Sequence, residues 1–254
     1  MGFGICLQLV LVGHVLADFY LQSDAMARHK GVDHRAMAEH CLVYAACVAV
    51  VSLVAFSGWH WVAAALSLSL SHALIDACKP RIGRALRKNS ACLIVDQALH
   101  LIICVVVVLV FRDGQATVPL AAAAGGLMGA NAATETLVVL LTCLIVLKPT
   151  DLLVRMTLGD LRLGEEDDSV EEGEHGKPHA RAGWLIGCLE RLIIVAFILT
   201  GQYTAVAFIL TAKSVARFKR LEDEEFSEVY LVGTLSSAAI AIIVPLVLMQ
   251  VVWW

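Results

Sequence analysis

Residues 90–111 read SACLIVDQALHLIICVVVVLVF, an apolar stretch that is interrupted by Asp96, Gln97 and His100. A helix of about 20 residues is long enough to cross the hydrocarbon core of a bilayer. Carboxylate and imidazole groups are costly inside a membrane unless they have partners or bind an ion, and they often mark a functional site. The stretch therefore predicts a membrane-spanning helix that carries part of a polar site.

The composition of the whole chain also predicts a membrane protein. Of its 254 residues, 59% are hydrophobic and 17% are charged, and the mean hydropathy is +0.78. These values lie far from those of an ordinary soluble domain. The basic residues fall in a few short loops and give no footprint for nucleic acid. We expect contact with membrane lipid and none with nucleic acid, and the sequence identifies no protein partner.

Eight segments have the length and apolar content of membrane spans. They are residues 3–22, 36–57, 58–78, 90–111, 132–148, 183–200, 203–220 and 230–252. We therefore predict an all-α polytopic membrane bundle with about eight spans. The segment 132–148 is short, and 203–220 contains Lys213 and Arg217, so either could instead be re-entrant or interfacial.

The basic loops predict the orientation of the spans. Three basic residues lie in loop 23–35 and five in loop 79–89, whereas the loops near 57–60 and 112–118 together contain one. Cytoplasmic loops carry the excess of Lys and Arg. The first two loops are therefore expected inside, and both chain termini outside.

An acidic segment divides the chain. Eight acidic residues fall between Asp160 and Glu174. A segment so polar cannot bury enough apolar surface to fold, so we predict that residues 159–182 form a cytoplasmic linker. It separates an N-terminal membrane bundle, residues 1–158, from C-terminal membrane helices, residues 183–254.

Three pairs of metal-capable side chains lie four residues apart within the apolar segments. The pairs are His14 and Asp18, His72 and Asp76, and Asp96 and His100. Four residues is close to one helical turn, so both members of a pair project from one face of the helix. With His40, all lie within about ten residues of the predicted cytoplasmic ends, or roughly 15 Å. They are expected to form one layer.

Imidazole and carboxylate groups together favour a transition metal. We expect a divalent ion, zinc first and manganese or iron as alternatives. The predicted metal ligands are His14, Asp18, His40, His72, Asp76, Asp96 and His100. Seven groups are more than one tetrahedral metal ion can bind. Two arrangements stay open: two metals, or one metal with carboxylates that orient the imidazoles.

A second polar cluster occurs in the C-terminal half. Arg191, Lys213 and Arg217 lie within apolar segments, and Glu190 precedes the first of them. Because an unpaired charge in a membrane is costly, Glu190 is expected to pair with Lys213 or Arg217. The surplus of cations, Arg191, Lys213 and Arg217, is predicted to bind the phosphate of a lipid substrate, since guanidinium and ammonium groups match phosphate oxygens. These two interpretations are compatible.

The chain resembles a family of uncharacterised bacterial multi-pass membrane proteins that carry a domain of unknown function. The resemblance rests on HxxxDFxLQ from His14 to Gln22, on His40, and on HxxxD and DQxxxH at His72 and Asp96. The first half is also similar in style to membrane-bound metal-dependent hydrolases. These resemblances imply a location in the bacterial inner membrane and a metal-dependent reaction.

We therefore expect a membrane-embedded, metal-dependent hydrolase that acts on a lipid or lipid-phosphate at the cytoplasmic leaflet. One of Asp18, Asp76 or Asp96 would serve as the general base. A transporter for a metal ion or for protons is the first alternative, because His and Asp also line such pathways. A non-catalytic membrane scaffold is the second.

Overall fold

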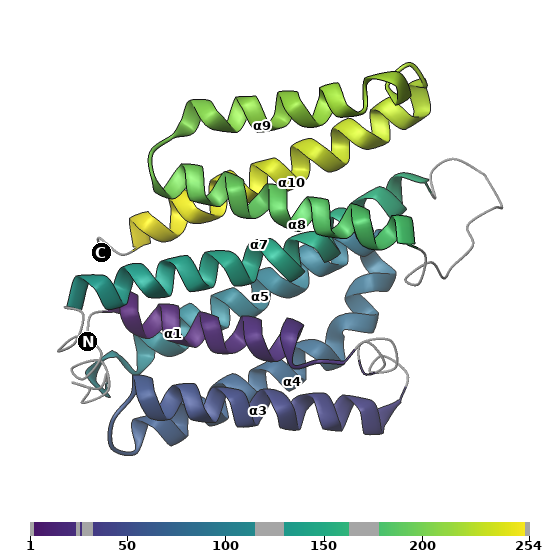
Figure 1. The fold of residues 1–254 in the computed structure, drawn as a ribbon. Helices are drawn as coiled ribbons and strands as arrows, with labels where there is room; N and C mark the ends of the chain where they lie inside the picture. Colours follow the sequence, from purple (N-terminus) through teal and green to yellow (C-terminus); the bar gives the residue numbers. More distant parts are fainter. Residues whose placement is uncertain (1–2, 24–25, 27–32, 115–129, 163–177, 252–254) are drawn as a thin grey trace. The chain divides into compact units, whose positions relative to one another are not determined.

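The computed structural model describes residues 3–23, 26, 33–114, 130–162 and 178–251 (Figure 1). Within these residues the chain forms eight α-helices, and seven of them are long and apolar enough to cross a membrane. This confirms the predicted all-α polytopic fold. The architecture is that of a multi-pass membrane protein.

Packing divides the chain into two units. Unit 1 comprises residues 1–144 and 249–254, and unit 2 comprises residues 145–248. The α-helices are α1 (Phe3–Val15), α3 (His34–Ala55), α4 (His60–Leu86), α5 (Asn89–Val110), α7 (Ala130–Arg162), α8 (Pro178–Leu199), α9 (Tyr203–Ala216) and α10 (Glu224–Val251). The short elements are a π-helix, η1 (Leu16–Tyr20), and two 3₁₀ turns, η2 (Arg112–Gly114) and η3 (Phe218–Arg220). The first division between the units falls within α7.

Four helices of unit 1 pack as a bundle (Figure 1). Each of α1, α3 and α4 contacts the next helix along the chain, and α5 contacts α1, so the four enclose a common core. Gly13 permits the close approach of α1 to α3, because a Cβ at this position would lie 2.8 Å from Val51 Cγ2. Cys47 Sγ also donates to the Gly13 carbonyl at 3.4 Å. These contacts orient α1 so that the face that carries His14 points toward the core of the bundle.

The bundle buries polar side chains beside its apolar core and exposes leucines on its outer surface. Leu42 on α3 and Leu70 on α4 are each 69% exposed, whereas His40 on α3 and His72 on α4 are at most 1% exposed. A soluble bundle would bury its leucines and expose its histidines. A membrane bundle can expose leucine to lipid, and its ionisable residues face the interior. Unit 1 follows the membrane pattern.

Unit 2 contains α8, α9 and most of α10, together with the C-terminal part of α7. Its apolar core includes Val146, Ile194, Val206 and Ala241. Helices α8 and α9 run antiparallel and are joined by a three-residue turn (Figure 1). Gly201 adopts a φ of +72° in this turn, a conformation that residues with a side chain rarely accept. The tight reversal therefore depends on glycine.

Two predicted boundaries differ from the structure. The segment 132–148, expected to be the shortest span, belongs to the 33-residue helix α7, which continues through Pro149. Lys148 and Asp151 therefore do not end the helix. The predicted loop 79–89 is mostly helical, because α4 continues to Leu86. Arg87, the residue that caps its C-terminus, adopts a left-handed backbone conformation.

The predicted span 203–220 is divided between two elements. Helix α9 has 14 residues, shorter than the seven helices that can span, and η3 follows it directly. The predicted linker 159–182 lies for the most part outside the described residues, since residues 163–177 are not described. The division of the chain by this linker stays a prediction.

We expect α9 and η3 together to cross the membrane, with their basic side chains reaching toward the cytoplasmic interface. Single cysteines at Gln202 and Glu222 should then react from opposite sides with a membrane-impermeant maleimide. The unsubstituted chain is the background, because its eight cysteines all lie in helices. Cysteines at Trp59 and Arg87 provide the outside and inside references. Labelling of Gln202 and Glu222 from one side would mean that α9 does not cross.

Candidate metal centre

The seven predicted ligands are all buried in unit 1 and form one cluster. Their exposed fractions run from 0% for His14 to 8% for Asp18. The cluster draws on all four helices of the bundle. His14 comes from α1, Asp18 from η1, His40 from α3, His72 and Asp76 from α4, and Asp96 and His100 from α5. The convergence that was predicted from their common depth is present.

Asp18 lies in the π-helix that continues α1. A π-helix adds a residue to the turn and is frequent at functional sites. His14 and Asp18 therefore do not simply share a face, as the four-residue spacing predicts for an α-helix. Asp18 Oδ1 lies 3.4 Å from His40 Nε2 on α3, whereas His14 Nδ1 lies 3.1 Å from the Tyr44 hydroxyl. The π-helix directs the two side chains to different partners.

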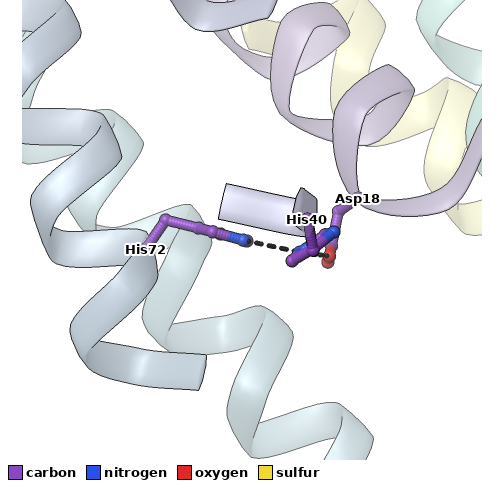
Figure 2. A group of neighbouring side chains, drawn as sticks. All are labelled: Asp18, His40 and His72. Carbon is purple, nitrogen blue, oxygen red and sulfur yellow. Dashed lines mark hydrogen bonds and ion pairs between the residues drawn. The ribbon is translucent and has the colours of Figure 1, made fainter. Parts of the chain in front are cut away.

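Three ligand atoms converge on His40 Nε2. His72 Nε2 lies at 2.9 Å, Asp76 Oδ2 at 3.3 Å and Asp18 Oδ1 at 3.4 Å. Figure 2 shows the side chains of Asp18, His40 and His72 pointing toward one another. His72 Nε2 also lies 3.7 Å from Asp76 Oδ2. These four atoms come from α3, α4 and the π-helix.

The spacing of the ligand atoms of Asp18, His40 and His72 fits a metal ion, because each lies within 4.8 Å of the others. Ligand atoms in a tetrahedral zinc site with bonds of about 2.0–2.1 Å lie about 3.3–3.4 Å apart. The four separations around His40 and His72 run from 2.9 to 3.7 Å. Each imidazole nitrogen carries at most one hydrogen, and an ionised carboxylate carries none. At most two hydrogens are therefore available for four atoms, whereas a cation held by Asp18, His40 and His72 would contact three of them.

His100 offers a further ligand atom. Its Nδ1 donates to the Asp96 carbonyl at 2.8 Å, which places the hydrogen on Nδ1. The Nε2 lone pair is then free, and among the described residues this buried atom has no hydrogen-bond partner. A metal-binding histidine is commonly oriented by such a bond from its other nitrogen. His72, Asp76 and His100 each offer a ligand atom within 4.8 Å of the others.

Gln97 connects the two sides of the cluster. Its Nε2 donates to Asp18 Oδ2 at 2.8 Å and to Asp96 Oδ2 at 3.2 Å. Its Oε1 accepts from His14 Nε2 at 3.3 Å. The other nitrogen of His14 faces the Tyr44 hydroxyl, so both nitrogens of His14 are occupied by protein groups. The predicted role of His14 as a metal ligand therefore stays a prediction.

Tyr44 supports the cluster from α3. Its ring stacks on the His72 imidazole, with centroids 3.6 Å apart and an interplanar angle of 7°. Its hydroxyl holds His14. Sequence reasoning assigned no role to Tyr44 or Gln97. Gln97 gave a signal that could have been used, since it is a polar residue beside Asp96 within an apolar span.

Lys79 forms an ion pair with Asp96. The Lys79 Nζ to Asp96 Oδ2 distance is 2.7 Å, and the Lys79 side chain is 31% exposed. Sequence reasoning treated Lys79 as a loop residue that sets orientation. Because α4 continues past it, Lys79 instead reaches the polar core. Asp96 Oδ2 is therefore held by Lys79 and Gln97.

The three predicted phosphate-binding residues lie together in unit 2. Arg191, Lys213 and Arg217 all line one pocket. Lys213 forms an ion pair with Glu190, as one of the two expected pairings predicts. Arg217 does not form an ion pair with Glu190. The surplus of cations inferred from the sequence is therefore reduced to Arg191 and Arg217.

Replacing Lys79 by Met should destabilise the protein, because it leaves the buried Asp96 carboxylate without its cation. We expect a loss of about 2 kcal/mol, less than for a fully buried pair because Lys79 is partly exposed. The double variant Lys79→Met/Asp96→Asn should recover part of this loss. Thermal unfolding in detergent measures both, with Lys88→Met as the control. Equal stability of Lys79→Met and Lys88→Met would contradict a structural role for the ion pair.

The comparisons with known proteins identify a family and no function. Searches of the curated proteins and of the solved structures gave no match. Residues 6–124 match a family described as "Protein of unknown function (DUF3307)". This range contains all seven predicted metal ligands, as well as Tyr44, Lys79 and Gln97. Residues 6–124 are therefore similar to this family of proteins of unknown function.

Proposed function

We propose that unit 1 binds one divalent metal ion, with Asp18, His40 and His72 as its protein ligands. The observation that carries the proposal is the convergence on His40 Nε2. One imidazole nitrogen and two carboxylate oxygens lie within 3.4 Å of it. Zinc fits a mixed set of imidazole and carboxylate donors, and manganese and iron accept the same groups.

We infer that the bound ion serves hydrolysis of a lipid or lipid-phosphate at the cytoplasmic leaflet of the bacterial inner membrane. Catalytic zinc sites commonly have three protein ligands and one open position. Bound there, a divalent ion would acidify water and polarise an ester or phosphoryl oxygen. A lipid substrate is consistent with a polar core that is enclosed by lipid-facing helices.

Asp76 is the best supported general base of the three carboxylates expected from the sequence. Its Oδ2 lies beside both imidazoles, at 3.3 Å from His40 Nε2 and 3.7 Å from His72 Nε2. Asp96 is held by Lys79, and Asp18 belongs to the ligand set. Asp76 would therefore accept the proton of the attacking water and return it to the leaving oxygen.

Transport of a metal ion or of protons is the second candidate. A continuous set of polar contacts favours it, because it leads from a partly exposed group to the cluster. Lys79 contacts Asp96, Asp96 contacts Gln97, and Gln97 contacts Asp18. Chains of ionisable residues inside membrane bundles serve as proton and ion relays. The same contacts would also stabilise a catalytic site, so an experiment must separate the two functions.

Element analysis of purified protein tests metal binding. Wild-type protein should retain about one equivalent of a divalent metal, and His40→Ala and His72→Ala should lose most of it, since each removes a ligand atom. His60→Ala is the matched control, because His60 lies at the other end of α4 and outside the cluster. Metal content that is the same in wild type and in both ligand variants would contradict the proposed site.

Reconstituted vesicles separate hydrolysis from transport. Phosphatidylcholine vesicles that contain phosphatidic acid should release inorganic phosphate, and Asp76→Asn should slow release by about 100-fold or more while keeping the metal. Glu39→Gln, an exposed carboxylate on α3, should have no effect. A zinc-sensitive dye inside the vesicles reports transport. Zinc entry without phosphate release would favour the transporter and exclude hydrolysis of this lipid.

A further inference from the structure

Unit 2 contains a pocket of about 460 Å³, within the size range of small-molecule sites. It lies where α7 and α9 end and where α8 and α10 begin. Its lining combines cations, carboxylates and an apolar wall that includes Leu158, Ile186 and Val229. A polar end beside an apolar wall resembles the two chemical halves of a lipid.

Arg191 is buried in the pocket wall with weak partners. Its side chain is 4% exposed, and the nearest carboxylate oxygen, Asp151 Oδ1, lies 4.0 Å from Nη2. The same carboxylate lies 2.8 Å from Arg155. Ser237 Oγ and the Leu147 carbonyl lie at 3.3 Å, and Nε has no hydrogen-bond partner among the described residues. A buried guanidinium without a close anion is costly, and a phosphate would offset this cost.

Arg217 supplies the second cation of the pocket. Its guanidinium lies 5.6 Å from the centroid of the Tyr230 ring, and within the described residues it forms no ion pair. Lys213 also faces this ring, at 5.7 Å, but Glu190 balances its charge. The Tyr230 hydroxyl is buried, and no described residue hydrogen-bonds to it. Two guanidinium groups and a phenol thus line one pocket, and all three can donate hydrogen bonds to phosphate oxygens.

Two carboxylates lie on the same pocket. Asp223 accepts from the Phe226 amide at 3.0 Å, at the start of α10, and Glu225 follows two residues later; both carboxylates are exposed. A purely anionic headgroup would be repelled by these carboxylates. An ammonium group would be attracted to them. The lining therefore suits a ligand that carries both a phosphate and an amine.

We propose that this pocket binds a zwitterionic phospholipid with a primary amine in its headgroup. Arg191 and Arg217 hold the phosphate, Asp223 and Glu225 accept the ammonium, and the apolar wall contacts the acyl chains. Basic pockets between membrane helices at the cytoplasmic side are known positions for lipid headgroups. The pocket lies entirely within unit 2, so the proposal is independent of the metal centre.

Binding of short-chain lipids to the full-length protein in detergent tests the phosphate contact. Dioctanoyl phosphatidylethanolamine is the probe, and native mass spectrometry gives the dissociation constant. Arg217→Gln should weaken binding about tenfold, the effect of losing one charged hydrogen-bonding group. Arg220→Gln is the matched control, because Arg220 lies over the Phe226 ring at 5.5 Å and outside the pocket. Equal affinities of the two variants would overturn the assignment of the phosphate.

The ammonium contact has its own test. Wild-type protein should prefer dioctanoyl phosphatidylethanolamine to dioctanoyl phosphatidylglycerol. Glu225→Gln should reduce this preference by about three- to fivefold, the size expected for an exposed ion pair, and Glu224→Gln should not. If the wild-type protein shows no such preference, the assignment of a zwitterionic ligand would be overturned. Inorganic phosphate should compete weakly, because it lacks the amine and the acyl chains. Full competition by phosphate at the affinity of the lipid would overturn the lipid assignment.

Discussion

The arrangement of unit 1 depends on the meeting of imidazole nitrogens with carboxylate oxygens around His40 Nε2. These atoms come from separate helices, so they meet only if α1, α3 and α4 pack in one register. The close contact at Gly13 and the stacking of Tyr44 on His72 both support that register. Without a cation or protons at the centre, the convergence would carry a large electrostatic cost inside a membrane. The polar core therefore constrains both the packing of the bundle and its chemistry.

Depth and periodicity were enough to predict which residues meet. Membrane spans have a nearly fixed length, so the distance of a residue from the end of its span gives its depth. For this reason His14, His40, His72 and His100 could be assigned to one layer before any helix was positioned. The same reasoning predicted an all-α membrane fold, because the apolar segments are too long for buried helices of a soluble domain.

The partners within that layer could not be predicted in the same way. The four-residue spacing of His14 and Asp18 assumes an α-helix, and the π-helix at Leu16–Tyr20 breaks this assumption. Lys79 was assigned to a loop because the apolar segment ends at residue 78, yet α4 continues past it and the side chain pairs with Asp96. Gln97 acts through contacts with three other residues, which one sequence cannot reveal. Helix ends and side-chain directions are tertiary properties.

The same constraint gives the two units different ligand preferences. In unit 1, ligand atoms of Asp18, His40 and His72 lie close together, an arrangement that supports the proposed metal ion. In unit 2, the guanidinium groups of Arg191 and Arg217 share a pocket with the carboxylates of Asp223 and Glu225. Opposite charges that share a pocket support the proposed ligand with separated charges. A bilayer makes buried charges costly, those of unit 1 and Arg191 of unit 2 among them, and a bound ligand would offset this cost.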